Sequence, residues 1–185
     1  MNKFAVLFII CAIAAGSANA SWQDYQPFCY FPDMVQVSLK QNTKAKVDVN
    51  LYSGTWYEIV RKPMSHQKEC VCSQAQYTNN GDHIGVFNQC NTKDGGLKSA
   101  SAKAYTANDY NTRLKVYFAP FIAGEYWILD IDPNYQWVIV GEPCKKFAWV
   151  LARTKTIPQD VLQARLNTLK SLGFDLSDLI PRGDC

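Results

Sequence analysis

Eight segments of strand length follow one another along most of this chain, and they constrain its fold more than any other feature. Clusters of Gly, Asn and Asp such as "NNGD" and "KDGG" separate several of them, which is typical of turns between strands. The connections are short, about four to eight residues, so consecutive strands are expected to be antiparallel neighbours. The expected strands cover residues 55–61, 70–78, 83–90, 99–107, 113–119, 125–131, 135–141 and 146–153.

One helix is predicted after the last strand. Leucine and valine recur at intervals of three and four residues between Val161 and Leu172, which indicates one apolar helical face. Pro158 stands at the start of this segment and Gly173 at its end, as is common at helix boundaries.

A meander of eight antiparallel strands leaves two exposed edges unless its first and last strands meet. Closure gives a barrel whose interior is just wide enough for one small ligand. We therefore predict an all-β fold, an eight-stranded antiparallel up-and-down β-barrel with a C-terminal α-helix packed on the outside. The expected organisation is a signal peptide at 1–20, an N-terminal tail at 21–46, the barrel at 47–157, and a C-terminal helix and tail at 158–185.

The first twenty residues are interpreted as a secretory signal peptide. They contain one early cation, Lys3, then an apolar run from Phe4 to Ala15 and a small-residue ending at Ala18–Ala20, which is the order found in signal peptides. The run of about 12 residues is shorter than the roughly 20 that a membrane-spanning helix needs. We expect a protein secreted to the extracellular space, or to the periplasm if the source is bacterial, with no membrane span after cleavage.

Charge and motif content argue against several functional classes. The formal net charge is +3 and the basic residues are scattered, without the clustering that nucleic acid binding requires, so no nucleic acid partner is expected. The sequence has no Gly-x-Ser-x-Gly elbow, no glycine-rich phosphate loop and no His-Glu-x-x-His motif. His66 and His83 stand in or beside loops, and Asp130 and Asp132 precede a proline, where carboxylates shape turns. No catalytic residue, cofactor or metal is predicted.

The chain contains seven cysteines. Cys11 lies in the expected signal peptide, and the other six, an even number in an exported chain, predict three disulfides. A zinc site would need paired Cys or His at set spacings, whereas this sequence has a single Cys-x-Cys and two isolated histidines. Six cysteines allow fifteen pairings, and the sequence alone does not choose among them.

Three short motifs resemble the signature regions of the lipocalin family. The resemblance implies that the tryptophan of the first motif plugs the closed end of the barrel and that the arginine of the third packs across its ring. A guanidinium shielded from water on an indole face contributes about 1–2 kcal/mol. The glycine of the first motif is expected to let the chain enter the barrel wall where a side chain would collide. The motifs are Gly54-Thr55-Trp56, Asp132-Pro133-Asn134-Tyr135 and Arg153.

The resemblance is closest to the branch that holds bacterial lipocalins and apolipoprotein D. It rests on "GTWYEI", "LKVYFAPF", "DPNY", "FAWVLARTKTIP" and "GFDLSDLI", and it covers about residues 47–180. It implies the disulfides Cys29–Cys144 and Cys72–Cys185, which would tether the two tails to the barrel.

Cys70 and Cys90 remain, and a bridge between them across the hairpin closed by "NNGD" is expected by elimination. Strand parity leaves this pairing open. Placing Cys70 directly opposite Cys90 also places Tyr77 opposite His83, whereas an inward Tyr77 beside an inward Ile84 needs a register that differs by one residue.

Strand alternation selects the side chains expected inside the barrel. The fourth strand carries small residues at Ala100, Ala102 and Ala104, which would leave room for a ligand, and Tyr77 and Asn88 would orient a ligand head group. The expected ligand-binding residues are Tyr77, Val86, Asn88, Leu114, Val116, Phe118, Trp127, Phe147 and Trp149.

The sixth strand has apolar residues on both faces. Either Trp127 with Leu129 and Ile131, or Tyr126 with Ile128, could face inward. We favour the set that contains Trp127, because Asp130 and Asp132 share the other face.

The expected function is that of a secreted protein that carries or sequesters a small hydrophobic ligand, such as a fatty acid, lysophospholipid, sterol, retinoid or pigment, in the barrel interior. The alternative is a lipocalin-fold enzyme acting on an oxidised lipid or an isoprenoid. The loop "FAPFIAG" at 118–124 resembles one in the family that contacts lipid surfaces, so peripheral membrane contact is also expected there. A monomer or weak dimer is expected.

Overall fold

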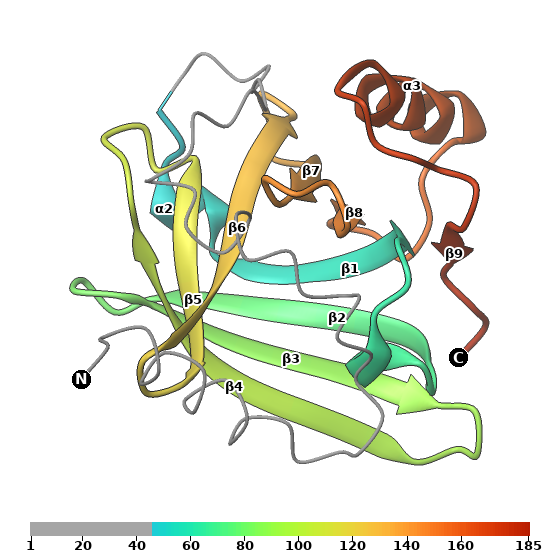
Figure 1. Ribbon diagram of the computed structural model, residues 1–185, viewed down its shortest axis with the longest axis horizontal. Coiled ribbons are helices and arrows are strands. Elements are labelled where there is room, and N and C mark those ends of the chain that lie inside the picture. The colour runs from blue at the N-terminus through green and yellow to red at the C-terminus, as the bar shows by residue number, and fades with distance from the viewer. Residues whose placement is uncertain (1–45) are drawn as a thin grey trace, which may run out of the picture. The chain divides into compact units, whose positions relative to one another are not determined.

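The structure is a computed structural model that describes residues 46–185. Eight antiparallel strands form one sheet in the order β2-β3-β4-β5-β6-β7-β8-β1, and β1 closes it by pairing with both β8 and β2 (Figure 1). The predicted eight-stranded up-and-down barrel is therefore confirmed. The strands are β1 (Gly54–Arg61), β2 (Cys70–Asn79), β3 (Ile84–Thr92), β4 (Leu97–Thr106), β5 (Arg113–Ala119), β6 (Ile122–Ile131), β7 (Trp137–Gly141) and β8 (Ala148–Ala152).

The predicted helix is α3 (Gln159–Ser171), which packs on the outside of the barrel (Figure 1). Pro158 immediately precedes it, and Gly173 follows it with a φ of +87°, which glycine adopts at no steric cost. No helix within residues 46–185 has the length and apolar character needed to cross a membrane.

Three short elements were not predicted: the helix α2 (Val49–Tyr52), the 3₁₀ turn η3 (Ser65–Gln67) and the strand β9 (Ile180–Pro181). α2 begins where the Asp48 carboxylate accepts hydrogen bonds from the backbone N–H groups of Asn50 and Leu51. This is a helix N-cap, and it holds a single turn across the start of β1.

Two apolar clusters stabilise the described part of the chain. One fills the inner side of the barrel and includes Trp56, Tyr77 and Val140. The other lies between the outer wall of the barrel and α3, where Val150 and Leu169 are almost completely buried. The strands of this wall carry apolar residues on both faces, because their outer face packs against α3.

β9 fills a gap between β1 and β2. These two strands are paired near Trp56 but separate toward their other ends. The backbone N–H of Arg182 donates to Ile59 O on β1 (2.8 Å), and the N–H of Gly183 donates to Val71 O on β2 (2.6 Å). The disulfide Cys72–Cys185, which the lipocalin resemblance implied, is present and holds the C-terminus at this seam.

The disulfide Cys70–Cys90 is also present. A bulge between Cys70 and Cys72 shifts the register of β2 against β3, so Tyr77 lies opposite Val86 while Cys70 lies opposite Thr92. The bulge therefore reconciles the bridge with an inward Tyr77.

The third expected bridge involves residues outside the described part of the chain. Cys144 is disulfide-bonded, and Cys29, its expected partner, lies outside residues 46–185. The expected signal peptide and all of the expected N-terminal tail except Lys46 lie outside this range as well.

Candidate functional site

One end of the barrel is sealed by Trp56. Its side chain is 0% exposed, and its Nε1–H donates to Tyr52 O at 2.8 Å. The Arg153 guanidinium carbon lies 3.8 Å from the centroid of the indole ring. The same guanidinium donates to Thr55 O (2.9 Å), among other backbone carbonyls. Ring and guanidinium together form the closed end that the sequence motifs predicted.

Gly54 opens β1 beside this plug, with a φ of +96°. A Cβ at this position would lie 3.4 Å from Arg153 Nη1, which is an ordinary contact. A Cβ alone therefore fits, and a collision of a longer side chain stays a prediction. Backbone conformation requires the glycine, because L side chains rarely adopt this φ.

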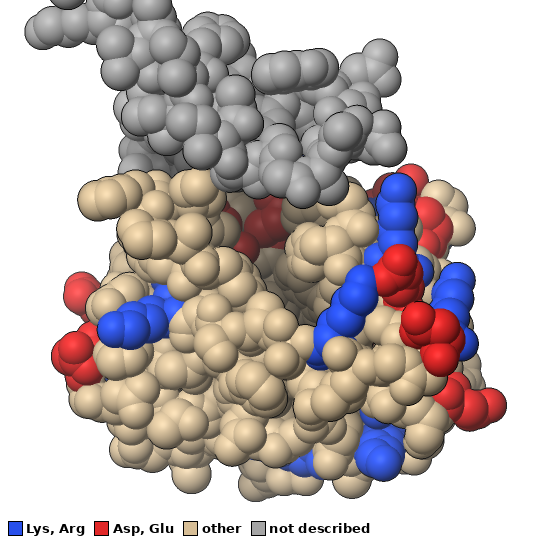
Figure 2. All heavy atoms as spheres, turned by 90° about the horizontal axis from the view of Figure 1, so that it is seen from below, with Lys and Arg blue, Asp and Glu red and all other residues tan. Residues whose placement is uncertain are grey.

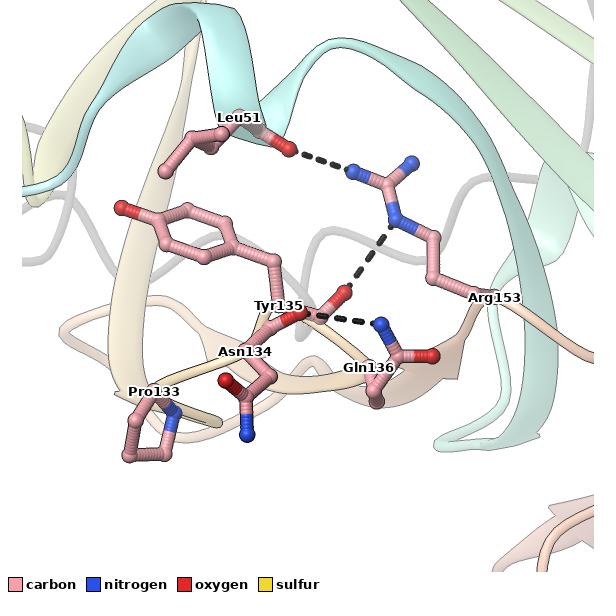
Figure 3. A pocket seen from close by; sticks show the side chains of 6 residues that line it. All are labelled: Leu51, Pro133, Asn134, Tyr135, Gln136 and Arg153. Atoms are coloured by element: carbon pink, nitrogen blue, oxygen red, sulfur yellow. Dashed lines mark hydrogen bonds between the residues drawn. The ribbon is translucent and has the colours of Figure 1, made fainter.

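An open surface pocket of about 390 Å³ lies on the Arg153 side of the plug (Figure 3). The turn before β7 forms one wall, where the Asp132 carboxylate accepts hydrogen bonds from the N–H groups of Asn134 and Gln136. Arg153 Nε–H donates to Tyr135 O (3.2 Å). Asp132 therefore shapes a turn, as predicted. The lining residues are Leu51, Pro133, Asn134, Tyr135, Gln136 and Arg153.

The opposite end of the barrel is open. On β4, Ala104 is 1% exposed, whereas Ala100, which lies on the same face nearer the far end, is exposed. On β8, Leu151 is 6% exposed, whereas Trp149, which lies on the same face nearer the far end, is half-buried. Exposure of the inward positions thus rises with distance from Trp56 on β4 and β8, whereas on β3 Cys90 is 6% exposed at the far end. Figure 2 shows one face hollowed near its centre, with uncharged residues around much of the hollow and acidic side chains visible inside it.

The structure places most of the predicted lining residues inside the barrel. Tyr77, Val86, Leu114, Val116 and Trp149 belong to, or pack against, the interior cluster. That these side chains contact a ligand remains a prediction.

Three of the other predicted residues lie closer to the open end. Asn88 is half-buried and lies between Ala75 and Ala100 in the sheet. Phe147 is half-buried, with its ring centroid 6.4 Å from that of Trp149. Phe118 is largely exposed and lies outside the interior cluster.

Three tyrosines meet near the closed end of the interior. The hydroxyl oxygens of Tyr52 and Tyr126 are 2.6 Å apart, and the Tyr77 hydroxyl donates to Tyr126 Oη at 3.0 Å. Burial raises the pKa of Tyr77 to about 12 and raises the pKa values of the other two phenols well above their usual range. All three are therefore neutral at physiological pH.

A buried ion pair also faces the interior. A bulge between Glu58 and Val60 on β1 places Glu58 opposite Leu151 and Arg61 opposite Trp149, and both partners on β8 belong to the interior face. Without this bulge, alternation from Trp56 would place Arg61 on the outer face. The sequence analysis did not identify this pair, because no local pattern indicates the extra residue.

The geometry of the pair is constrained by its neighbours. Arg61 Nε lies 3.0 Å from Glu58 Oε1, and Arg61 is 2% exposed. Burial raises the pKa of Glu58, and the charge of Arg61 opposes this rise. Within the described residues, Arg61 Nη1, Gln67 Oε1 and Ser73 Oγ are buried without hydrogen-bond partners.

The sequence was compared with known families. A family model described as a lipocalin-like domain matches residues 47–184. This chain belongs to the lipocalin family. It is 34% identical over 143 residues to temperature-induced lipocalin-1 of Arabidopsis thaliana, covering 72% of this chain and 77% of that protein. It is likewise 34% identical over 137 residues to the outer membrane lipoprotein Blc of Escherichia coli K12, covering 72% and 77%.

A mammalian relative and a solved structure extend these similarities. The chain is 32% identical over 142 residues to apolipoprotein D of Macaca fascicularis, covering 71% of this chain and 74% of that protein. Insecticyanin from the tobacco hornworm Manduca sexta has a similar fold, with a TM-score of 0.59, 20% identity and coverage of 76% and 82%. The expected relationship to bacterial lipocalins and apolipoprotein D is confirmed.

In this lipocalin the side chains around Trp127 on β6 point to the opposite faces from those predicted. Trp127 points to the outer wall, where the Arg113 guanidinium lies 4.1 Å from its ring centroid and Nε1–H donates to Glu125 Oε2 at 2.9 Å. Tyr126 and Ile128 face inward. The prediction was wrong because α3 makes the outer face of β6 apolar as well.

Asp130 and Asp132 also misled the assignment of faces on β6, because the strand does not alternate regularly. A bulge separates Ile128 from Asp130 in the pairing of β6 with β7. As a result Ile131 joins Ile128 on the interior side, although alternation would place them on opposite faces.

The histidines do not assemble a site within residues 46–185. His66 is exposed, as expected. His83 is half-buried in the β2–β3 turn, where its ring contacts Asp82 Oδ1 at 2.7 Å. The described residues contain no cluster of three metal-ligating side chains.

Proposed function

We propose that this lipocalin binds a small hydrophobic ligand inside the barrel and carries or sequesters it. The observation that carries the proposal is the rise in exposure of the inward face from Ala104 to Ala100 and from Leu151 to Trp149. It indicates a mainly apolar interior that opens at one end and carries a few polar groups, among them the Glu58–Arg61 pair. Such concave, mainly apolar sites with a few polar groups are typical of ligand-binding pockets.

Affinity would come from the transfer of apolar ligand surface out of water. Each buried methylene contributes about 0.8 kcal/mol, or roughly a fourfold gain in affinity, before ordering costs. Affinity for a series of alkyl ligands is therefore expected to rise with chain length and to level off when the interior is full. A fatty acid, lysophospholipid, sterol, retinoid or pigment fits this chemistry.

The location of the protein is part of the proposal. The sequence of residues 1–20 supports export, and we propose an extracellular or periplasmic site of action. One relative carries the name outer membrane lipoprotein. Carrier function is preferred over the enzyme alternative because Asp132 is committed to a turn.

The test compares two tryptophans on opposite sides of the wall. Trp149 faces the interior, whereas Trp137 lies on the outer wall beneath the Arg165 guanidinium (3.7 Å from its ring centroid). Loss of about 55 Å² of apolar contact at about 25 cal/mol per Å² weakens binding about tenfold. Trp149→Ala should reduce retinol affinity by about this factor, and Trp137→Ala should not.

Retinol emission and calorimetry both report the affinity, and the melting temperature reports ligand stabilisation. A wild-type protein that shows no change with retinol, fatty acids and sterols at saturating concentrations would rule the proposal out. Equal weakening in both variants would place the binding surface elsewhere.

A second activity is proposed for the β5–β6 loop at the open end. Phe121 is 97% exposed and Phe118 is 55% exposed, and such an apolar projection favours contact with a lipid surface. Phe121→Ser should reduce co-sedimentation with phosphatidylcholine vesicles. Tyr110→Ser is the control, since Tyr110 is 58% exposed at the opposite end, and an equal loss in the control would exclude a role for the loop.

A further inference from the structure

The tyrosine cluster has more donors than it uses. Three phenols supply three O–H groups, but only two hydrogen bonds join them, from Tyr77 to Tyr126 and between Tyr52 and Tyr126. No other hydrogen bond from these hydroxyls occurs within residues 46–185. One hydroxyl proton therefore remains without an acceptor in the described part of the chain.

The position of the spare proton follows from burial. Tyr77 already donates to Tyr126 Oη, so the spare proton belongs to Tyr52 or Tyr126. Tyr52 is 2% exposed, whereas Tyr126 is partly exposed. A donor buried without a partner costs about 1–3 kcal/mol. The favoured arrangement has Tyr52 donating to Tyr126, which leaves the Tyr126 O–H free.

The Tyr126 oxygen is held in place by its neighbours. Its ring packs edge-on against Tyr77 with centroids 6.1 Å apart. The Tyr52 ring packs in turn against Trp56 at 5.2 Å. In the favoured arrangement Tyr126 Oη accepts from both neighbours, so its own O–H points away from both donors, and the Tyr126 side chain packs against the interior cluster.

The surroundings of Tyr126 select the kind of acceptor. The cluster around it is apolar, including Val138, Leu114 and Ile128. The Arg153 guanidinium donates to backbone carbonyls. The charge of Arg61 is balanced by Glu58, although its Nη1 has no hydrogen-bond partner within the described residues. A carboxylate at this depth would lose its hydration and bring a negative charge that neither arginine is left to balance. A ketone or hydroxyl oxygen would be satisfied by one phenol.

From these observations we infer that Tyr126 donates a hydrogen bond to an uncharged oxygen, a ketone or hydroxyl group, at the end of the ligand that enters the barrel first. The inference rests on the proposed ligand binding and adds the chemical class of the ligand. Tyr126 is then the residue that distinguishes oxygenated from purely hydrocarbon ligands.

The experiment uses ligands of equal chain length: 2-dodecanone, dodecane and dodecanoate. Their affinities for the full-length protein are measured by competition with retinol, in the wild type, in Tyr126→Phe and in Tyr117→Phe. Tyr117 lies on the outer face of β5, where its ring contacts Tyr105, so its variant is the matched control.

Tyr126→Phe should weaken 2-dodecanone about 3- to 10-fold, which corresponds to a hydrogen bond of roughly 0.7–1.4 kcal/mol. Affinity for dodecane should stay the same, and Tyr117→Phe should change neither. Dodecanoate should be insensitive to Tyr126→Phe, because its carboxylate is expected at the open end. Equal effects on dodecane and 2-dodecanone, or a selective effect on dodecanoate, would overturn the inference.

An infrared measurement on the wild type does not depend on the folding of a variant. The carbonyl stretch of bound 2-dodecanone should shift to lower wavenumber than in hexane, because a hydrogen bond weakens the C=O bond. An unshifted band would refute the role of Tyr126 while leaving ligand binding intact. Failure of the wild type to bind retinol, dodecane and 2-dodecanone alike would instead refute the proposed function, and this inference with it.

Discussion

Replacement of Trp56 by alanine should cost stability and leave ligand preference unchanged. The side chain is 0% exposed, its Nε1–H donates to Tyr52 O, and Arg153 covers its ring. Truncation of a buried tryptophan costs about 3–5 kcal/mol, and a desolvated cation–π contact adds up to about 2 kcal/mol. The expected loss is about 5 kcal/mol, a large part of the roughly 5–15 kcal/mol that holds a typical domain together.

Urea unfolding followed by far-UV circular dichroism measures this loss with the disulfides intact. For a chain of 185 residues, about 5 kcal/mol corresponds to a fall of roughly 10–20 °C in melting temperature. Trp56→Phe retains most of the apolar volume and should lose about 1–2 kcal/mol, mainly through the missing N–H.

Trp137→Ala is the control, because it also removes a tryptophan stacked by an arginine, but one that is only half-buried on the outer wall. The reasoning is refuted if Trp56→Ala loses no more stability than Trp137→Ala. It is equally refuted if Trp56→Ala changes the ratio of retinol to fatty-acid affinity by more than it lowers stability, both expressed as free energies, while the barrel stays folded.

Two further predictions concern the buried phenols and the C-terminal seam. Because folding raises the pKa of Tyr77 from 10.0 to about 12, its contribution to stability is complete below pH 10 and is lost as the pH rises through 12, about 2–3 kcal/mol in all. Urea midpoints between pH 8 and 11.5 should fall less steeply in Tyr77→Phe than in wild type, and parallel curves would contradict this. The double variant Cys72→Ser/Cys185→Ser should lose about 2–4 kcal/mol and become sensitive to carboxypeptidase, and an unchanged melting temperature would show that β9 holds without its bridge.

The strand pattern was predictable because it depends on local features. Turn clusters such as the one around Gly81 mark the ends of strands, and short connections force antiparallel neighbours. The side-chain period of two then assigns the faces of β3, β4 and β5, where Val86, Ala102 and Val116 occupy the interior as alternation requires. The helix was predictable for the same reason, since its apolar period and the flanking Pro158 and Gly173 are all local.

Face assignment failed where a strand contains a bulge or carries apolar residues on both faces. The extra residue in β1 brings Arg61 to the interior, and the one in β6 separates Ile128 from Asp130. A bulge depends on how two distant strands fit, so neither sequence segment reveals it. Trp127 was misassigned because α3, more than thirty residues further along the chain, buries the outer face of β6.

The interior and the plug use polar groups in opposite ways. Arg153 donates to backbone carbonyls on α2, β1 and the turn before β7, so its N–H groups are occupied and its work is structural. Tyr126 accepts from Tyr77 and, in the inferred arrangement, also from Tyr52, which leaves its own proton to donate. A group whose donors already have acceptors within the protein has no hydrogen bond to offer a ligand. A fixed hydroxyl with an unused donor binds more tightly to a ligand that supplies an oxygen acceptor. Stability and selectivity in this barrel are therefore expected to respond to different substitutions.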